Sequence, residues 1–305
     1  MEKIHILLST YNGEKYIKEQ LDSLIRQTYN NFLIIVRDDG STDRTVDIIK
    51  EYQSIYPSKI ELHVGENIGW RKSFHWLMKN AGDADCYSFC DQDDIWRDHK
   101  LEHAVKVLED INSDIPAVYL SEFTWCDGEM NPIRMNEAYK KHHSLEKYIT
   151  LGDRNAFGFT MHFNKTALDA VKGADCIDKG CSHDETTYLY CLLKGTTIWG
   201  NISDADYRRH GGNAANVDLK GGNIVSHFLW RISYFLFQNH KKETYQRFYY
   251  FYKSFQNQLT EHEKNVFKLY LGKKGKLKKA VMGGRYRDNL FDEISIRILF
   301  LLGKI

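Results

Sequence analysis

Strand-like and helix-like segments alternate through the first 125 residues, and this alternation leaves few folds open to the chain. Short apolar runs predict buried strands, and apolar residues at helical spacing predict the helices between them. The strands are expected at 4–9, 32–36, 60–64, 86–90 and 117–123. Three helices are expected at 14–27, 70–79 and 101–111, and a further helix is expected to begin after a cap at Ser41 or Thr42. This order predicts an α/β fold whose mostly parallel, Rossmann-like sheet has helices on both faces.

Polar residues follow three of these strands. The first strand runs into Thr10-Tyr11-Asn12, the second into Asp38-Asp39 and the fourth into Asp91-Gln92-Asp93-Asp94. In an open α/β sheet the ligand crevice lies outside the carboxyl ends of the strands. The sequence therefore predicts a ligand site where these three segments meet.

The remainder of the chain has two stretches of different character. From 126 to 219 Gly, Asn and Asp are frequent, with a helix predicted from His183 or Asp184 to 193 and a strand at 196–199. Beyond 220 the sequence is helical, aromatic and basic. We expect one domain at 1–219, divided near 125, and a C-terminal helical region at 220–305.

Charge is distributed unevenly between these regions. Residues 1–219 contain 25 Lys and Arg against 35 Asp and Glu, and residues 220–305 contain 17 against six, although the whole chain has a formal charge of only +1. Such asymmetry predicts different partners for the two regions. The lysine-rich segment 273–279 and the apolar stripe 294–302 favour peripheral contact with an anionic membrane. The alternative is a helical subdomain that packs on the rest of the chain or on another subunit.

The sequence lacks the signals of a secreted or membrane-spanning protein. We find no uncharged apolar run of about 18 residues, and the N-terminal segment has no signal-peptide pattern. The six cysteines show no CxxC pair. In a chain of this length they predict reduced, mostly buried thiols and a cytoplasmic protein.

The segment 91–94 places three carboxylates within four residues, directly after a buried strand. Carboxylate oxygens suit Mg²⁺ or Mn²⁺, and Mg²⁺ commonly shares its ligand shell with substrate phosphates. The structural alternative is a solvated acidic helix cap. It must also account for the second acidic strand end at Asp38-Asp39, which favours the metal interpretation.

These segments, taken together, resemble the family 2 inverting glycosyltransferases, which have the GT-A fold. The matching motifs are Ser9-Thr10-Tyr11-Asn12, Gln27-Thr28-Tyr29, Asp38-Asp39-Gly40-Ser41-Thr42-Asp43, Asn67-Ile68-Gly69 and Asp91-Gln92-Asp93-Asp94. They follow one another in the family's order and spacing over roughly residues 3–215. The extension Ile95-Trp96 is most similar to the rhamnosyltransferases of streptococcal wall and capsule polysaccharides.

The resemblance implies how the donor and a metal are bound. It makes 1–125 the nucleotide-binding half and 126–219 the acceptor half. Thr10, Tyr11 and Asn12 would line the base pocket, and Asp39 would accept a hydrogen bond from the pyrimidine N3–H. Gly69, Arg71, Asp91, Gly158 and Arg209 would also contact the nucleotide sugar. Asp93 and His210 would bind Mn²⁺ or Mg²⁺.

The resemblance also implies a catalytic base. An inverting transfer needs a group that takes the proton of the acceptor hydroxyl, and a carboxylate at a helix start can do this. Asp184 matches that position, with His183 and Glu185 as supporting neighbours. Glu185 stands where related rhamnosyltransferases carry Trp, which puts the acceptor and the donor sugar in doubt.

The expected reaction moves a sugar, favoured as L-rhamnose from dTDP-rhamnose, onto a lipid-linked cell-wall or capsular precursor at the inner face of the plasma membrane. A UDP-hexose donor is the alternative within the same fold. We expect no nucleic-acid partner and leave a homo-oligomer open.

Other classes of protein fit the sequence less well. A nucleotidyltransferase would need a glycine-rich basic loop after the first strand, and a dehydrogenase would need G-x-G-x-x-G there. A non-catalytic nucleotide-sugar or RNA-binding protein would leave the acidic strand ends unexplained.

Overall fold

The computed structural model describes residues 2–136, 144–149, 156–211, 240–272, 275–281, 286 and 290–303. The chain divides into two compact units. One contains Met1–Lys140, Asn155–Asp178 and Ser182–Asn213, and the other contains Lys141–Arg154, Lys179–Cys181 and Ala214–Ile305. The boundary predicted at 219/220, and the start of the helical region predicted beyond it, lie outside the described residues.

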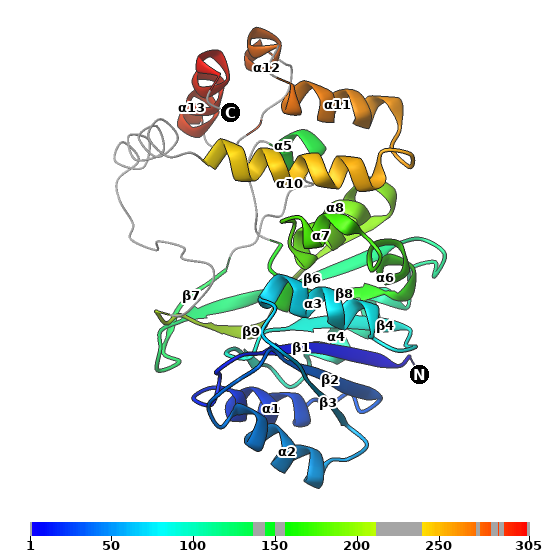
Figure 1. Cartoon of the computed structure of the whole chain (residues 1–305), viewed down its shortest axis with the longest axis vertical. Helices are drawn as coiled ribbons and strands as arrows, with labels where there is room; N and C mark the ends of the chain where they lie inside the picture. Colours follow the sequence, from blue (N-terminus) through cyan, green and yellow to red (C-terminus); the bar gives the residue numbers. More distant parts are fainter. Residues whose placement is uncertain are drawn as a thin grey trace. The chain divides into compact units, whose positions relative to one another are not determined.

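The first unit is built on one mixed sheet with the strand order β3-β2-β1-β4-β8-β6-β9-β5 and β7 paired to β6 (Figure 1). The strands are β1 Ile4–Thr10, β2 Phe32–Asp38, β3 Ile60–Val64, β4 Cys86–Cys90, β5 Ile95–Trp96, β6 Ala117–Cys126, β7 Pro132–Met135, β8 Met161–Asn164 and β9 Thr196–Arg208. Strands β3, β2, β1 and β4 are parallel, as are β6 and β9. Every antiparallel pair of this sheet, in the part of the chain that is described, involves β5, β7 or β8.

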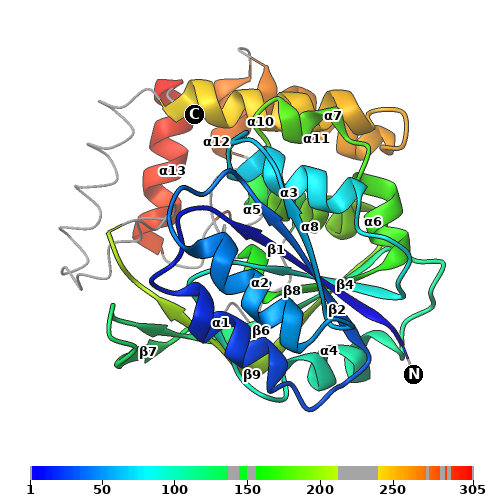
Figure 2. The same cartoon turned by 60° about the horizontal axis from the view of Figure 1, so that its bottom comes forward.

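Helices cover both faces of the sheet, which confirms the predicted α/β fold (Figures 1 and 2). The helices of this unit are α1 Ile17–Ile25, α2 Thr45–Ile55, α3 Trp70–Lys79, α4 Lys100–Leu108, α6 Lys165–Val171, α7 Asp175–Asp178 and α8 His183–Lys194. Helices α1 and α2 pack side by side, and α3 packs against α7 and α8. The start of α4 is joined to the end of α1, because the Leu101 N–H donates to Gln27 Oε1 at 3.1 Å.

The core follows from the apolar pattern of these elements. All residues of β4 and β6 are buried, and β1 is buried at every position except Ser9. Helix α1 buries Ile17, Leu21 and Leu24, the i, i+4, i+7 face that its sequence predicts. Packing of these apolar faces fixes the positions of the carboxyl ends of β1, β2 and β4, after which the three polar segments follow.

Two local predictions differ from the structure. Strand β9 extends to Arg208 rather than 199, since it pairs with β6 through register shifts that accommodate its polar middle part. The prediction that Ser41 or Thr42 caps α2 is wrong: the N-cap residue is Arg44, without a side-chain cap. The Ser41 hydroxyl instead bonds to the preceding loop.

The second unit is helical in its described part. It contains α5 Leu145–Ile149, α10 His240–Phe255, α11 Glu261–Leu271, α12 Lys276–Val281 and α13 Leu290–Leu302. Helix α11 begins with a capping box between Thr260 and Glu263.

The structure bears on the predicted cysteines and on the predicted lack of a membrane-spanning helix. All six cysteines are free and buried, as predicted. None of the described helices has the length and apolar character needed to cross a membrane.

Candidate active site

The carboxyl ends of three parallel strands meet at one edge of the sheet. Thr10, the last residue of β1, lies opposite Asp38 at the end of β2, and Leu8 lies opposite Cys90 at the end of β4. The three segments that follow these strands therefore leave the sheet at neighbouring positions. This is the edge at which α/β sheets bind ligands.

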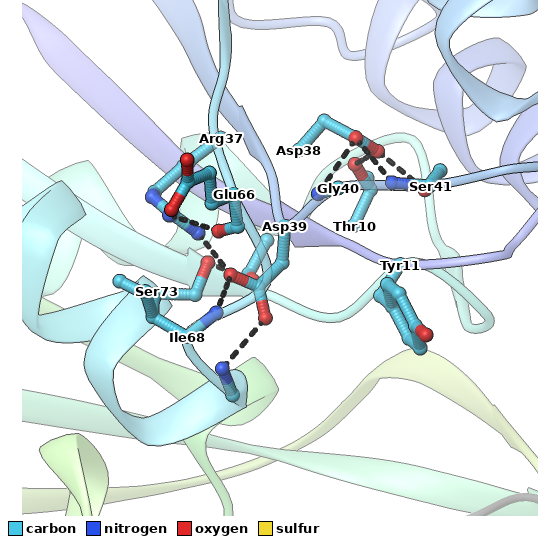
Figure 3. Close-up of polar contacts among 12 residues, drawn as sticks. Thr10, Tyr11, Arg37, Asp38, Asp39, Gly40, Ser41, Glu66, Ile68 and Ser73 are labelled. Atoms are coloured by element: carbon cyan, nitrogen blue, oxygen red, sulfur yellow. Dashed lines mark hydrogen bonds and ion pairs between the residues drawn. The ribbon is translucent and has the colours of Figure 1, made fainter.

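The Asp38 carboxylate is fully buried and organises the loop after β2 (Figure 3). It accepts hydrogen bonds from the Thr10 hydroxyl at 2.9 Å, from the Gly40 and Ser41 N–H groups at 3.1 and 2.8 Å, and from the Ser41 hydroxyl at 2.6 Å. A carboxylate has about four acceptor positions, so these donors saturate it. Asp38 therefore shapes the loop and is not available to a ligand.

Asp39 has a different environment, although it is the next residue. Its buried Oδ1 accepts from Arg37 Nη1 at 2.5 Å and from the Ile68 N–H at 2.9 Å, and its Oδ2 accepts from the Gly69 N–H at 2.8 Å (Figure 3). The Arg37 guanidinium balances the charge of this carboxylate. Counting donors among the described residues, one acceptor position of Asp39 stays open, on Oδ2.

Gln92 joins the first and third polar segments. Its Oε1 accepts from the Tyr11 N–H at 2.8 Å, and its Nε2 donates to the Tyr11 carbonyl at 3.0 Å. A Cβ at Gly13 would lie 2.3 Å from Gln92 Oε1, so a side chain there would displace the Gln92 amide from Tyr11. Asn12 adopts φ of 44° and its Oδ1 accepts from the Thr42 N–H at 2.9 Å. These contacts leave the Tyr11 side chain 47% exposed at the loop surface.

Asp93 and His210 form a direct pair. Asp93 Oδ2 lies 2.8 Å from His210 Nε2, and both side chains are 16% exposed. The His210 ring stacks on Tyr16, with 4.6 Å between ring centroids. The structure thus brings together the two residues that the sequence assigned to a metal, from segments 117 residues apart.

Arg208 fixes the backbone around this pair. Its Nε donates to the Asp93 carbonyl at 3.1 Å, its guanidinium pairs with Glu19, and it lies 5.0 Å from the centre of the Tyr16 ring. Its N–H donates to Asp94 Oδ1 at 3.2 Å. Buried in this network, Arg208 supports the loop rather than presenting its charge to a ligand.

Acidic groups accumulate at this edge of the sheet. Burial, with the charges of Asp93 and Asp184, raises the pKa of Asp91 to about 8. Burial also raises the pKa of Asp94 well above its ordinary value. Burial and the neighbouring acidic groups thus disfavour the ionised forms of both side chains, and a cation beside them would favour ionisation.

Asp184 lies in the first turn of α8, after the N-cap Ser182, whose side chain accepts from the Glu185 N–H. The neighbouring His183 is buried, with its ring stacked on Phe74 at 3.8 Å. Burial lowers the pKa of His183 to about 4, so the ring is neutral at ordinary pH. Glu185 is also buried.

Gly158 lies against the start of α8. A Cβ at this position would come within 2.8 Å of His183 Nε2 and 3.5 Å of Asp184 Cβ. The 3-10 turn Gly158–Thr160 and the first turn of α8 therefore approach as closely as their backbones allow. The structure thus places Gly158, Asp184 and Asp91 in one neighbourhood.

The remaining predicted residues lie on the flanks. Gly69 has φ of +84°, which favours glycine, and precedes α3. The exposed Arg71 has its guanidinium 4.4 Å from the Trp70 ring centre, and its charge acts on His183. Arg209 is half-buried and its N–H donates to the Cys126 carbonyl at 3.0 Å.

Some expected neighbours are not in direct contact. In the described residues, no hydrogen bond joins Asp39 to the Asp93–His210 pair. Nor do three His, Cys, Asp or Glu side chains of the described segments gather closely enough to hold a metal ion by themselves.

Sequence reasoning missed Gln92, Tyr16 and Arg37 as parts of the site. Each has a site partner from a distant segment, so no local pattern identifies its role. The one available signal was the position of Gln92 and Arg37 beside the acidic strand ends.

The chain matches a known family and several known proteins over part of its length. The family model described as "Glycosyl transferase family 2" matches residues 5–170. The chain is 35% identical over 225 residues to the uncharacterized glycosyltransferase alr2836 of Nostoc sp., which is 69% of this chain and 66% of the relative. It is 41% identical over 105 residues to the dTDP-rhamnosyl transferase RfbG of Shigella flexneri, 33% of this chain and 36% of the relative. The chain therefore spans about two thirds of the first relative and about a third of the second.

Solved structures share the fold across the chain. The crystal structure of Staphylococcus aureus TarS 1-349 in complex with UDP-GlcNAc is 17% identical with a TM-score of 0.55, over 99% of this chain and 92% of that one. The mannosyltransferase PcManGT of Pyrobaculum calidifontis, in complex with GDP-Man and Mn²⁺, is 17% identical with a TM-score of 0.57, over 99% and 74%. At such identities the likeness concerns the fold alone.

Proposed function

Because the chain belongs to glycosyl transferase family 2, we propose that it transfers a sugar from a nucleoside diphosphate donor to a hydroxyl group of a growing polysaccharide. The observation that carries this proposal is the pairing of Asp93 with His210 beside Asp91 and Asp184. The charges of Asp93 and Asp184 both act on Asp91, so the start of α8 adds an acidic group to the surroundings of Asp91. A protein that only binds its ligand would have no use for this further acidic group.

The Asp93–His210 pair fits a divalent cation, Mn²⁺ or Mg²⁺. Two neighbouring ligands of an octahedral ion, each at about 2.1 Å, lie about 3 Å apart. The observed 2.8 Å between Asp93 Oδ2 and His210 Nε2 is close to that spacing. The cation, when bound with the donor diphosphate, would stabilise the negative charge that develops on the leaving group.

Asp184 is our proposed general base. The acceptor oxygen forms its bond to the anomeric carbon while the bond from that carbon to the diphosphate oxygen breaks. The hydroxyl proton passes to the Asp184 carboxylate, and attack from the face opposite the leaving group inverts the anomeric configuration. The neutral His183 ring stacks on Phe74, and the lack of a side chain at Gly158 leaves room for the first turn of α8, which carries this carboxylate.

The loops at the sheet edge are the proposed donor site. Asp39, with its open acceptor position, suits the N3–H of uracil or thymine, and the exposed Tyr11 and Asn12 would flank the base. Thr10 would act by fixing this loop, because its hydroxyl is bonded to Asp38. We assign Gly69 and Arg71 at the start of α3, together with Arg209, to the diphosphate.

For the donor sugar we favour L-rhamnose from dTDP-rhamnose, with UDP-GlcNAc as the second candidate. The match to the Shigella dTDP-rhamnosyl transferase supports the first. The likeness to TarS, whose name gives N-acetylglucosamine transfer to poly(ribitol-phosphate), supports the second. We propose a lipid-linked cell-wall or capsular precursor as the acceptor, with the reaction at the cytoplasmic face of the membrane.

A binding experiment separates these donors. Thermal unfolding would be followed with dTDP-rhamnose, UDP-GlcNAc and GDP-mannose, each with and without Mn²⁺. We expect stabilisation by a pyrimidine donor that is larger with Mn²⁺. Equal shifts with all three donors, or none with any, would contradict the proposed site.

A substitution then tests the chemistry. Asp184→Asn removes the base but retains the shape of the side chain, so transfer should fall by about 10²–10⁴-fold while donor binding stays near that of the wild type. Asp169→Asn, at a half-exposed position on α6, is the matched control and should leave transfer unchanged. Near-normal turnover by Asp184→Asn would exclude its role as the base.

A further inference from the structure

Helix α13 has two apolar faces, and only one of them is covered. On the covered face Ile296 and Phe300 are buried against Ala280 of α12 and Tyr286. The other face exposes large apolar side chains along the whole helix, namely Leu290, Phe291, Ile294, Ile298, Leu301 and Leu302. Burying one stripe suffices to fold a helix onto its unit, so the second stripe needs a separate explanation.

Helix α12 extends this exposed surface. Leu277 and Val281, one turn apart, are each 66% exposed, and Lys276 and Lys278 beside them are exposed as well. A Cβ at Gly303 would lie 2.4 Å from Lys276 Cε, so this lysine lies at the end of α13. The exposed stripes of the two helices and their lysines are called the α12–α13 surface below.

The other charged side chains of these helices that the structure describes have partners within the unit. Lys279 is buried and donates to the carbonyls of Tyr270 and Gly272 at 3.3 and 3.4 Å. Arg297 is paired with the buried Glu293 and also donates to the Ala280 carbonyl at 2.7 Å. Among the described side chains of α12 and α13, the charges left on the surface are therefore positive.

We propose that the α12–α13 surface docks the chain onto a bilayer that contains anionic lipid. A row of large apolar side chains flanked by lysines is the composition of a helix that lies in the headgroup region of a membrane. The lysines would be attracted to the anionic headgroups. A second copy of the chain fits less well, since a two-fold contact of this surface with itself would bring the lysines Lys276 and Lys278 of both copies toward one another.

This inference rests on the second unit alone and holds whatever sugar the first unit transfers. Exposed apolar side chains scattered singly need no explanation. Here eight of them belong to two helices in direct contact, which is the pattern of an interaction surface. Docking would bring the chain to the membrane that holds a lipid-linked acceptor, if the proposed function is correct.

The test uses the full chain and sedimentation with vesicles of phosphatidylcholine, with or without 30% phosphatidylglycerol. We expect binding to the anionic vesicles only, weakened at high salt. The double variant Lys276→Gln/Lys278→Gln should bind about fivefold more weakly for each lysine removed. Equal binding to both kinds of vesicle, or none to either, would overturn the proposal.

The apolar stripe has its own variant and control. The triple variant Leu290→Ser/Ile294→Ser/Ile298→Ser should lose vesicle binding by at least tenfold. The control Ile55→Ser/Ile133→Ser/Ile202→Ser removes three comparably exposed side chains of the other unit and should bind as the wild type does. Circular dichroism and thermal unfolding check that both variants fold, and donor binding checks the first unit independently.

A dye attached to the α12–α13 surface reports the environment of that surface while most of its apolar side chains are kept. Phe291→Cys carrying an NBD dye should give increased and blue-shifted emission with anionic vesicles and no change with phosphatidylcholine alone. Light scattering coupled to size-exclusion chromatography measures the oligomeric state and so tests whether a second copy of the chain binds this surface. A dimer in the wild type that the triple serine variant lacks would assign the surface to a second copy, and an unchanged dye spectrum would exclude contact with lipid.

Discussion

Tyr16 contacts one of the two proposed metal ligands and the arginine that supports the other. Its ring stacks on His210 and lies beneath the Arg208 guanidinium, and Arg208 donates to the Asp93 carbonyl. Through these contacts it holds the imidazole with Nε2 directed at Asp93. We regard Tyr16 as a positioning residue, because it acts through His210 and Arg208.

Replacing this ring should weaken metal binding before it affects anything else. Aromatic pairs are worth about 0.5–1.5 kcal/mol, so Tyr16→Leu should raise the Kd for Mn²⁺ in the presence of dTDP by about threefold to tenfold. Tyr16→Phe keeps the stack and should restore wild-type affinity. Isothermal titration gives both values, and equal Kd values for the Leu and Phe variants would contradict the positioning role.

Lys100 is a fully buried cation behind the acidic loop. Its Nζ donates to Ser121 Oγ at 3.0 Å, and burial lowers its pKa to about 8. Between pH 8 and the ordinary lysine value near 10.4, the unfolded chain binds a proton that the folded chain has lost. The contribution of Lys100 to stability therefore rises with pH through that window.

A methionine substitution isolates this contribution. The free energy of unfolding of Lys100→Met, relative to wild type, should fall by about 1 kcal/mol per pH unit between pH 8 and 10. Lys106→Met, at an exposed position of the same helix, should show no such trend. Urea unfolding at several pH values measures both differences, and parallel pH profiles for wild type and Lys100→Met would contradict the account.

At the scale of single residues, the resemblance to the family assigned Asp39, Asp91, Asp93, Asp184 and His210 to the site, and the pairing of Asp93 with His210 is consistent with that assignment. The structure then distinguishes neighbours that the motif treats alike. Asp38 is saturated by local donors, whereas Asp39 has an open acceptor position. That distinction depends on Thr10 and Arg37, which reach the carboxylates only after β1 and β2 have paired.

Among the elements, β9 and α8 matter most because each ends or begins at the site. Strand β9 places Arg208 beside the acidic loop and is followed by His210, and α8 begins at His183. The start of α8, expected at His183 or Asp184, was predicted correctly. The full length of β9 was not, because its central residues are polar and its pairing with β6 is interrupted by register shifts.

The approach of α8 to the turn at Gly158 predicts a sensitive position. In Gly158→Ala the new methyl group would meet His183 Nε2 at 2.8 Å, so the ring or the helix must move. Overpacking of this kind costs about 1–3 kcal/mol, and displacement of Asp184 should lower kcat at least tenfold with a smaller change in the donor KM. Thermal unfolding and steady-state kinetics measure these effects.

Gly173 supplies the control for that substitution. It lies after α6 in the same unit, and nothing lies within 4 Å of the Cβ it would gain. Gly173→Ala should therefore behave as the wild type does. If both alanine variants retained wild-type kcat, the close approach at Gly158 would have no part in placing the base.

For the molecule as a whole, the order and direction of the strands bring distant segments of the proposed site to one edge of the sheet. Asp39 follows β2, Asp93 follows β4 and His210 follows β9. The α/β class and this edge could be predicted from strand and helix periodicity alone. The antiparallel insertion of β8 between β4 and β6 could not be predicted in this way. The strand has only four residues, which is too short for its sequence pattern to distinguish it from a loop.

The division of the chain into units follows contacts rather than sequence position. Residues 141–154 and 179–181 group with the C-terminal helices, although they come from within the first 219 residues. No change of composition marks these segments in the sequence. The charge asymmetry did indicate that the two regions differ, and the acidic site and the lysine-bearing α12–α13 surface lie in different units.

The central claim, that acidic side chains at the carboxyl edge gather around one divalent ion and a diphosphate, is tested most directly by anomalous diffraction. Crystals of the full chain would be soaked with Mn²⁺ and dTDP, and data collected near the manganese absorption edge. We predict one anomalous peak, bonded to Asp93 Oδ2, His210 Nε2 and diphosphate oxygens. Nucleotide bound at the loops with no manganese beside Asp93, or manganese bound elsewhere, would contradict the account.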